Sequence, residues 1–177
     1  MRRGLAIALA AVMLAGCGGL DDRDREALEA FQNDPLFEIV PPGATKARDF
    51  LTPGSPDRSE SRPGSANNRH VSWDDVDGTP EQVIQTYVVA LQELGWHEIV
   101  LTCADELGAG YGIRAARARD QRVDVVRVGA SYDSSRDGEV GVYIAMDAPH
   151  HGSPQYAEPD PDVPPDTTCL DAQAASS

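Results

Sequence analysis

Residues 79–96, Thr-Pro-Glu-Gln-Val-Ile-Gln-Thr-Tyr-Val-Val-Ala-Leu-Gln-Glu-Leu-Gly-Trp, specify a helix together with both of its ends. Thr79 and Gln82 have the spacing of a capping box, and Pro80 stands at the first helical position, which suits its fixed φ angle. Apolar side chains then recur at the spacing of one helix face. These are Val83, Ile84, Tyr87, Val88, Leu91 and Leu94.

The end of this helix is as well defined as its start. Gly95 follows where a left-handed C-terminal cap is expected, and Trp96 stands where such a cap packs back on the helix. The sequence therefore predicts one long helix over about residues 80–94. Six segments with strand character surround it: 44–51, 69–74, 97–103, 111–119, 122–132 and 139–147. This order predicts an α+β fold, an antiparallel sheet of about four to six strands with the helix packed on one face.

Segments of different composition flank this sheet and helix. Residues 22–33 predict a short helix, because acidic residues crowd its start and Asp34-Pro35 ends it. Residues 53–68 are rich in Pro, Gly and Ser and predict a mobile loop. The predicted organisation is a signal peptide over 1–16, a tether and short helix over 17–34, a single α+β domain over 35–148, and an irregular, acidic, proline-rich tail over 149–177, pinned by Cys169.

The N-terminus has the pattern of an export signal. Two arginines precede ten apolar residues, and the run closes on Leu14-Ala15-Gly16-Cys17. A bilayer-spanning helix needs about 20 apolar residues, so this run is too short for one. The ending resembles the lipobox of bacterial lipoprotein precursors. That resemblance implies cleavage before Cys17, a diacylglycerol on its thiol with palmitate-type acyl chains, and a location on the extracytoplasmic face of the cell membrane.

The charge of the chain limits its partners. The sequence has 15 basic and 29 acidic residues, a formal net charge of −14, and loss of Arg2 and Arg3 with the signal peptide leaves −16. Such a chain is repelled by the phosphates of nucleic acid and by anionic lipid head groups. Its hold on the membrane is therefore expected to come from the acylated Cys17. The expected partner is an envelope protein, a cell-wall component or a small anionic ligand.

A second resemblance concerns the mature chain. The pattern Tyr87-x3-Leu91-x3-Gly95-Trp96, on a capped helix followed by strands, resembles small exported domains of actinobacterial lipoproteins. The segments 35–37 and 40–45 are similar to turns upstream in such proteins. This resemblance implies the fold and the location, and it transfers no active-site residue.

Two cysteines remain once Cys17 is assigned to lipid. Cys103 and Cys169 predict a disulfide outside the cytoplasm, and the chain-entropy model gives at most about 4 kcal/mol for a loop of this length. Two free thiols or a metal pair are the alternatives, although no Cys-x-x-Cys spacing occurs. Strand alternation places Cys103 on one face with His97, Ile99 and Leu101.

Five arginines within fourteen residues are the unusual pattern of this acidic chain. A hairpin turning at 120–121 places Arg117 opposite Asp124, and it places Arg114 opposite Arg127. Like charges directly opposite each other are destabilising, so Arg114 and Arg127 are candidates to clamp a phosphate or carboxylate. The alternative is that an acidic residue of the chain supplies the counter-charge. The five are Arg114, Arg117, Arg119, Arg122 and Arg127.

The sequence contains no recognisable catalytic set. It has no Gly-x-Ser-x-Gly elbow, no phosphate-binding glycine loop and no cofactor motif. His150 and His151, close to Asp147, could hold a metal ion, but a solvated loop is the simpler interpretation. The sequence therefore predicts a non-catalytic binding or protein-interaction module of the cell envelope. The alternatives are a metal-dependent envelope enzyme using His150 and His151, or a structural subunit of an envelope complex.

Overall fold

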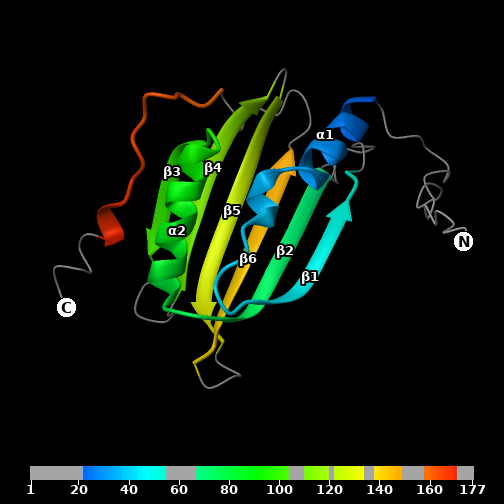
Figure 1. The fold of residues 1–177 in the computed structure, drawn as a ribbon. Helices are drawn as coiled ribbons and strands as arrows, with labels where there is room; N and C mark the ends of the chain where they lie inside the picture. The colour runs from blue at the N-terminus through cyan, green and yellow to red at the C-terminus, as the bar shows by residue number, and fades with distance from the viewer. Residues whose placement is uncertain are drawn as a thin grey trace, which may run out of the picture.

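Six antiparallel strands form one sheet in the spatial order β1-β2-β6-β5-β4-β3 (Figure 1). This computed structural model describes residues 22–54, 67–103, 110–119, 122–133, 138–148 and 158–170, with only the backbone for Arg23 and Asp24. The α+β class and the antiparallel sheet are confirmed. The strands are β1 (Thr45–Thr52), β2 (Asn67–Val76), β3 (His97–Cys103), β4 (Gly110–Arg119), β5 (Arg122–Tyr132) and β6 (Val140–Ala148).

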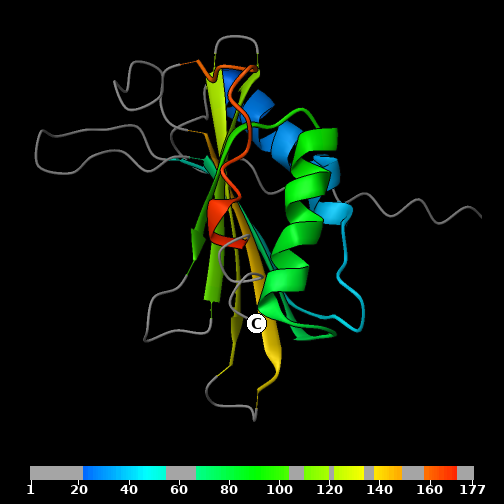
Figure 2. The ribbon, with the colours of Figure 1, turned by 90° about the vertical axis from the view of Figure 1, so that its left-hand side faces the viewer.

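Helices α1 (Asp22–Gln32) and α2 (Pro80–Glu93) lie on the same side of this sheet (Figure 2). Helix α2 packs on β4 and β5, and α1 packs on β2. A 3-10 turn, η1 (Pro35–Glu38), follows α1. We call the helix-bearing side of the sheet the covered face. The opposite side, where the described residues place no helix, is called the open face.

Both ends of α2 have the predicted caps. The Thr79 hydroxyl accepts a hydrogen bond from the Gln82 amide at 3.3 Å, and the Gln82 side-chain oxygen accepts one from the Thr79 amide at 3.0 Å. At the other end Gly95 has a φ of 73°. The Trp96 amide donates to the Leu91 carbonyl at 2.9 Å, which completes a Schellman motif.

The core lies between the helices and the covered face. The Tyr87 hydroxyl donates to the Ile39 carbonyl at 3.0 Å, and burial raises the pKa of Tyr87 far above its ordinary value. Arg69 of β2 donates to the last carbonyls of α1, those of Phe31 and Gln32, each at 2.8 Å. The largest fully buried side chains are Trp73, Trp96, Tyr87, Phe31, Leu36, Ile84 and Leu91.

A segment near the C-terminus covers the edge strand β3. The Asp166 amide donates to the Ile99 carbonyl at 2.9 Å, and the Asp166 carbonyl accepts from the Leu101 amide at 3.3 Å. The predicted disulfide between Cys103 and Cys169 is present, with the Cα atoms 6.0 Å apart. These contacts satisfy part of an edge that would otherwise be open to another strand.

The alternation predicted along β3 is interrupted. Ile99 and Leu101 are buried. The register shifts between His97 and Val100, and His97 pairs with Ala116 on the open face. Glu98, at the shift, has a φ of 49°. The prediction that His97 shares a face with Leu101 is therefore wrong, because one irregular residue reverses the side to which the next residue points.

Candidate functional site

The five arginines of the β4–β5 hairpin are divided between the two faces of the sheet. The predicted register is confirmed, with Arg114 opposite Arg127 and Arg117 opposite Asp124. Alternate residues of a strand point to opposite faces. Three of the arginines therefore lie on the covered face and two on the open face. The first group is Arg117, Arg119 and Arg122, and the second is Arg114 and Arg127.

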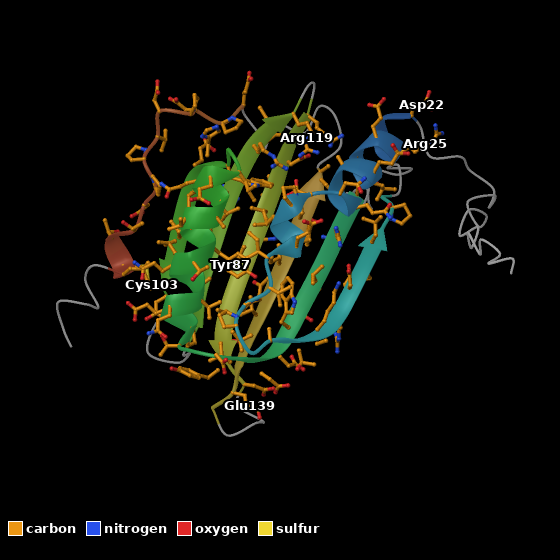
Figure 3. All side chains as sticks on the ribbon, viewed as in Figure 1. Asp22, Arg25, Tyr87, Cys103, Arg119 and Glu139 are labelled. Carbon is orange, nitrogen blue, oxygen red and sulfur yellow. A yellow bond between two sulfur atoms is a disulfide. The ribbon has the colours of Figure 1, made fainter. Side chains whose placement is uncertain are left out.

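The covered-face arginines belong to a buried ionic network, and Arg119, which is labelled in Figure 3, lies at one end of the sheet. We define the buried network as Asp34, Asp124, Arg117, Arg119 and Arg122. The Asp34 and Asp124 side chains are fully buried. Arg119 contacts Asp34 at 3.2 Å and Arg122 contacts Asp124 at 2.8 Å. Arg117 also contacts Asp34, and its guanidinium carbon lies 4.1 Å from the centre of a Trp96 ring.

This network gives three of the five arginines, Arg117, Arg119 and Arg122, a structural role. Asp34 also accepts a hydrogen bond from the Leu36 amide at 3.1 Å, so the same carboxylate starts η1 and holds two arginines. The network thus ties the segment that follows α1 to the β4–β5 hairpin. Sequence reasoning found the pair of Arg117 with Asp124 but missed Asp34, which is distant in the chain.

The open face carries three parallel rings from three neighbouring strands. We call Phe50, His70 and Tyr143 the aromatic row. The ring centres of Phe50 and His70 are 4.9 Å apart with an interplanar angle of 8°, and those of His70 and Tyr143 are 5.9 Å apart at 4°. Phe50 is 47% exposed and Tyr143 44%. Partial burial lowers the pKa of His70, and the positive charge of Arg48 lowers it further.

Beyond Tyr143 the next two strands carry glycines, and the open face is hollowed there. A Cβ atom added to Gly129 would lie 2.2 Å from Cε1 of Tyr143, so this ring rests directly on the Gly129 backbone. A pocket of about 240 Å³ follows, which we call the glycine-floored pocket. Its floor includes Gly110, Gly112 and Gly129, and Thr102, Ser131 and Tyr143 also line it.

The two open-face arginines lie beside this pocket but differ in their partners. Arg127 forms an ion pair with Asp147, so an acidic residue of the chain supplies its counter-charge. Arg114 forms no ion pair with any residue in the described ranges, and it is exposed. It follows Gly112 by two residues on the same face, a distance of about 7 Å along the strand. Among the described residues, Arg114 is thus a cation without an ion-pair partner that lies on the same face as the pocket.

Other predicted sites lie where nothing can be described. The signal peptide over 1–16, the lipidation site Cys17, and the metal candidates His150 and His151 are all outside the described residues. Within the described part, no group of three or more His, Cys, Asp or Glu side chains is placed to hold a metal ion. The helices of that part include none that is long and apolar enough to cross a membrane.

Comparison with known proteins identifies no relative of this chain. No protein-family model, curated protein sequence or solved structure matches the chain. The similarity to exported actinobacterial domains, based on the end of α2, stays a prediction. The candidate site is therefore defined by the aromatic row, the glycine-floored pocket and Arg114.

Proposed function

We propose that this protein is a lipid-anchored, extracytoplasmic binding module without catalysis, and that the open face is its binding surface. The observation that carries the proposal is the aromatic row. Clusters of exposed apolar side chains are often interaction sites when they form a large contiguous patch. Aromatic side chains and arginine are also the residues enriched where proteins recognise partners.

The contrast between the two faces supports this choice of surface. On the covered face, the arginines of the hairpin are held in ion pairs by the buried Asp34 and Asp124. On the open face, Phe50 and Tyr143 are exposed and Arg114 is uncommitted among the described residues. The open face thus offers apolar area, a positive charge and a hollow within a few strands.

The membrane anchor in this proposal is Cys17. The net charge of −16 expected after signal-peptide removal would repel an anionic membrane, so the acyl chains supply the attachment. We expect a Cys17→Ala variant to lose incorporation of radiolabelled palmitate and to leave the membrane fraction. A variant that keeps both the label and the membrane association would overturn the anchor.

The binding surface is tested with the full chain extracted in detergent from the membranes of its own cells. We expect envelope components to co-purify with the wild type after chemical crosslinking, and to be lost with a Phe50→Ala/Tyr143→Ala double variant. Val89→Ala is the matched control, because Val89 is 50% exposed but lies on α2, away from the open face. Equal recovery with the double variant and the control would contradict an open-face binding site.

The same preparation separates the two alternative functions. A metal-dependent enzyme using His150 and His151 would contain stoichiometric zinc that a His150→Ala variant loses. A structural subunit would co-purify with a fixed set of envelope proteins whose recovery does not depend on Phe50 or Tyr143. The binding module predicts neither result.

A further inference from the structure

The aromatic row has a free end. Its three rings come from β1, β2 and β6, one ring for each strand, and the planes are nearly parallel. The next strands in the sheet, β5 and β4, carry Gly129 and Gly112 in line with Tyr143. The row therefore stops where the glycine-floored pocket begins. A ring placed over Gly112 would be the next member of the stack, with Tyr143 on one side and Thr102 on the other.

The size and lining of the pocket fit one ring. The pocket is a hollow largely open to solvent, and its volume of about 240 Å³ is below the roughly 300 Å³ at which pockets for drug-sized ligands begin. Tyr143 gives it an apolar wall, and Thr102 and Ser131 add hydroxyl groups. A pyranose ring likewise has an apolar part and a polar part, because its C–H face is apolar and its hydroxyl groups lie at the periphery.

The positive charge beside the pocket indicates which substituent the bound ring carries. Arg114 lies about 7 Å along β4 from Gly112, on the same face as the pocket. It has no ion pair with a described residue, whereas Arg127 opposite it is neutralised by Asp147. A guanidinium group matches the paired oxygens of a carboxylate or phosphate. An anionic substituent on the bound ring would reach this charge.

We propose that the glycine-floored pocket binds a single saccharide ring that bears a carboxylate or phosphate, stacked on Tyr143 and paired with Arg114. This inference rests on the proposed function, because an acidic cell-surface glycan is a ligand for an extracytoplasmic module. Of the two arginines that the sequence had singled out as anion-binding candidates, only Arg114 then pairs with the anionic group. The Arg114–Arg127 pair does not act as a two-armed clamp.

The test uses the full chain in a non-glycosidic detergent and three probes, namely glucuronate, glucose and benzoate. Binding is followed by titration calorimetry at millimolar ligand. We expect glucuronate to bind more tightly than glucose or benzoate. Arg114→Gln should weaken glucuronate about tenfold, to the level of glucose, which corresponds to about 1.4 kcal/mol. Inorganic phosphate and glucose 6-phosphate, added in separate titrations, distinguish a ring requirement from binding of a free anion.

A second set of variants tests the pocket itself. Gly112→Val should abolish binding of both sugars, because its side chain occupies the floor; an added Cβ there meets only Thr102 and Val128 atoms at 3.6 Å or more, and valine favours strands. Gly112→Ala, a smaller change, should weaken both sugars if the valine variant fails to fold. Gly141→Ala is the matched control on the open face outside the pocket lining, and it should bind normally.

Several outcomes would overturn the inference. If Gly112→Val bound both sugars as tightly as the wild type, the binding site would lie outside the glycine-floored pocket. If Arg114→Gln bound glucuronate as tightly as the wild type, Arg114 would not pair with the carboxylate. Tighter binding of benzoate would indicate an aromatic side chain of a protein partner, and phosphate binding as tight as glucose 6-phosphate would indicate a free anion. If the Phe50→Ala/Tyr143→Ala variant lost the envelope components but the wild type bound no glucuronate, the open face would still be a binding surface. Only its assignment to an acidic saccharide would be rejected.

Discussion

The two faces of the sheet use the same residue type for opposite purposes. On the covered face, Arg117 lies over Trp96 and forms an ion pair with the buried Asp34. On the open face, Arg114 is exposed and has no ion partner in the described ranges. The two arginines are only three residues apart. The alternation of a strand thus decides which arginine stabilises the fold and which one is available to a ligand.

The largest expected effect is loss of a buried charge on the covered face. Asp124 is fully buried and lies against Arg117, Arg119 and Arg122. An Asp124→Asn variant leaves these cations with Asp34 as their only carboxylate in the network. We expect it to lower the free energy of unfolding by about 3 kcal/mol, the low end for a broken buried pair, because the arginines reach solvent. Urea denaturation of the full chain measures this change.

The matched control for Asp124→Asn lies on the open face. Asp147→Asn removes the partner of Arg127, whose side chain is 57% exposed. Exposed ion pairs contribute at most about 1 kcal/mol, so this variant should stay near the wild type. If Asp124→Asn and Asp147→Asn lost the same free energy of unfolding, the covered-face arginines would not differ from the open-face arginines in their contribution to stability.

The sequence was sufficient for the elements and for one hairpin, because both are determined locally. The capping box and Gly95 give the bounds of α2 within one or two residues. Only two residues separate β4 from β5 in the sequence, so Arg117 was placed opposite Asp124 correctly. These features depend on residues close together in the chain.

The candidate site was not predictable, because it depends on strand order. Phe50 and His70 come together only because β1 pairs with β2, and Tyr143 joins them only because β6 lies between β2 and β5. Nothing in the local patterns indicates that order. Asp34 was missed for the same reason, since 83 residues separate it from Arg117. The one available signal in the sequence was the alternation along each strand between positions that point to one face of the sheet and positions that point to the other.

A smaller effect is expected where Tyr143 rests on the sheet. A Gly129→Ala variant places a methyl group 2.2 Å from Cε1 of Tyr143, so the ring must move off the Gly129 backbone. Tyr143 is 44% exposed and can move, so we expect a loss of about 1 kcal/mol, the low end for an overpacked site. Thermal unfolding measures the loss, and near-ultraviolet circular dichroism reports the altered tyrosine environment.

Gly112→Ala is the control for Gly129→Ala within the same row of the sheet. Its added methyl group makes only ordinary contacts, at 3.6 Å or more. An alanine at such a position restricts the unfolded chain, so this variant should be unchanged or more stable by up to about 1 kcal/mol. If both variants lost the same stability, the close contact of Tyr143 with Gly129 would have no effect of its own on the free energy of unfolding.

The smallest expected effect concerns the pH dependence of the open face. His70 lies between Phe50 and Tyr143, and its pKa is lowered from the ordinary value of 6.5, first by burial and then by Arg48. The unfolded chain therefore takes up this proton at a higher pH than the folded chain. The stability that neutral His70 contributes is complete above about pH 6.5 and is lost as the pH falls through the folded pKa.

His70→Phe isolates this contribution, because phenylalanine keeps a ring in the aromatic row but cannot be protonated. Between neutral pH and about pH 5, the wild type should lose slightly more stability than His70→Phe, as measured by the difference in Tm. Background titration of carboxylates is common to both proteins and cancels in this comparison. If the two proteins lost the same stability, His70 would be as hydrated as in the unfolded chain. The stacked rings would then not shield one another from water, and the apolar surface on which the open-face binding site depends would be smaller than the exposed rings suggest.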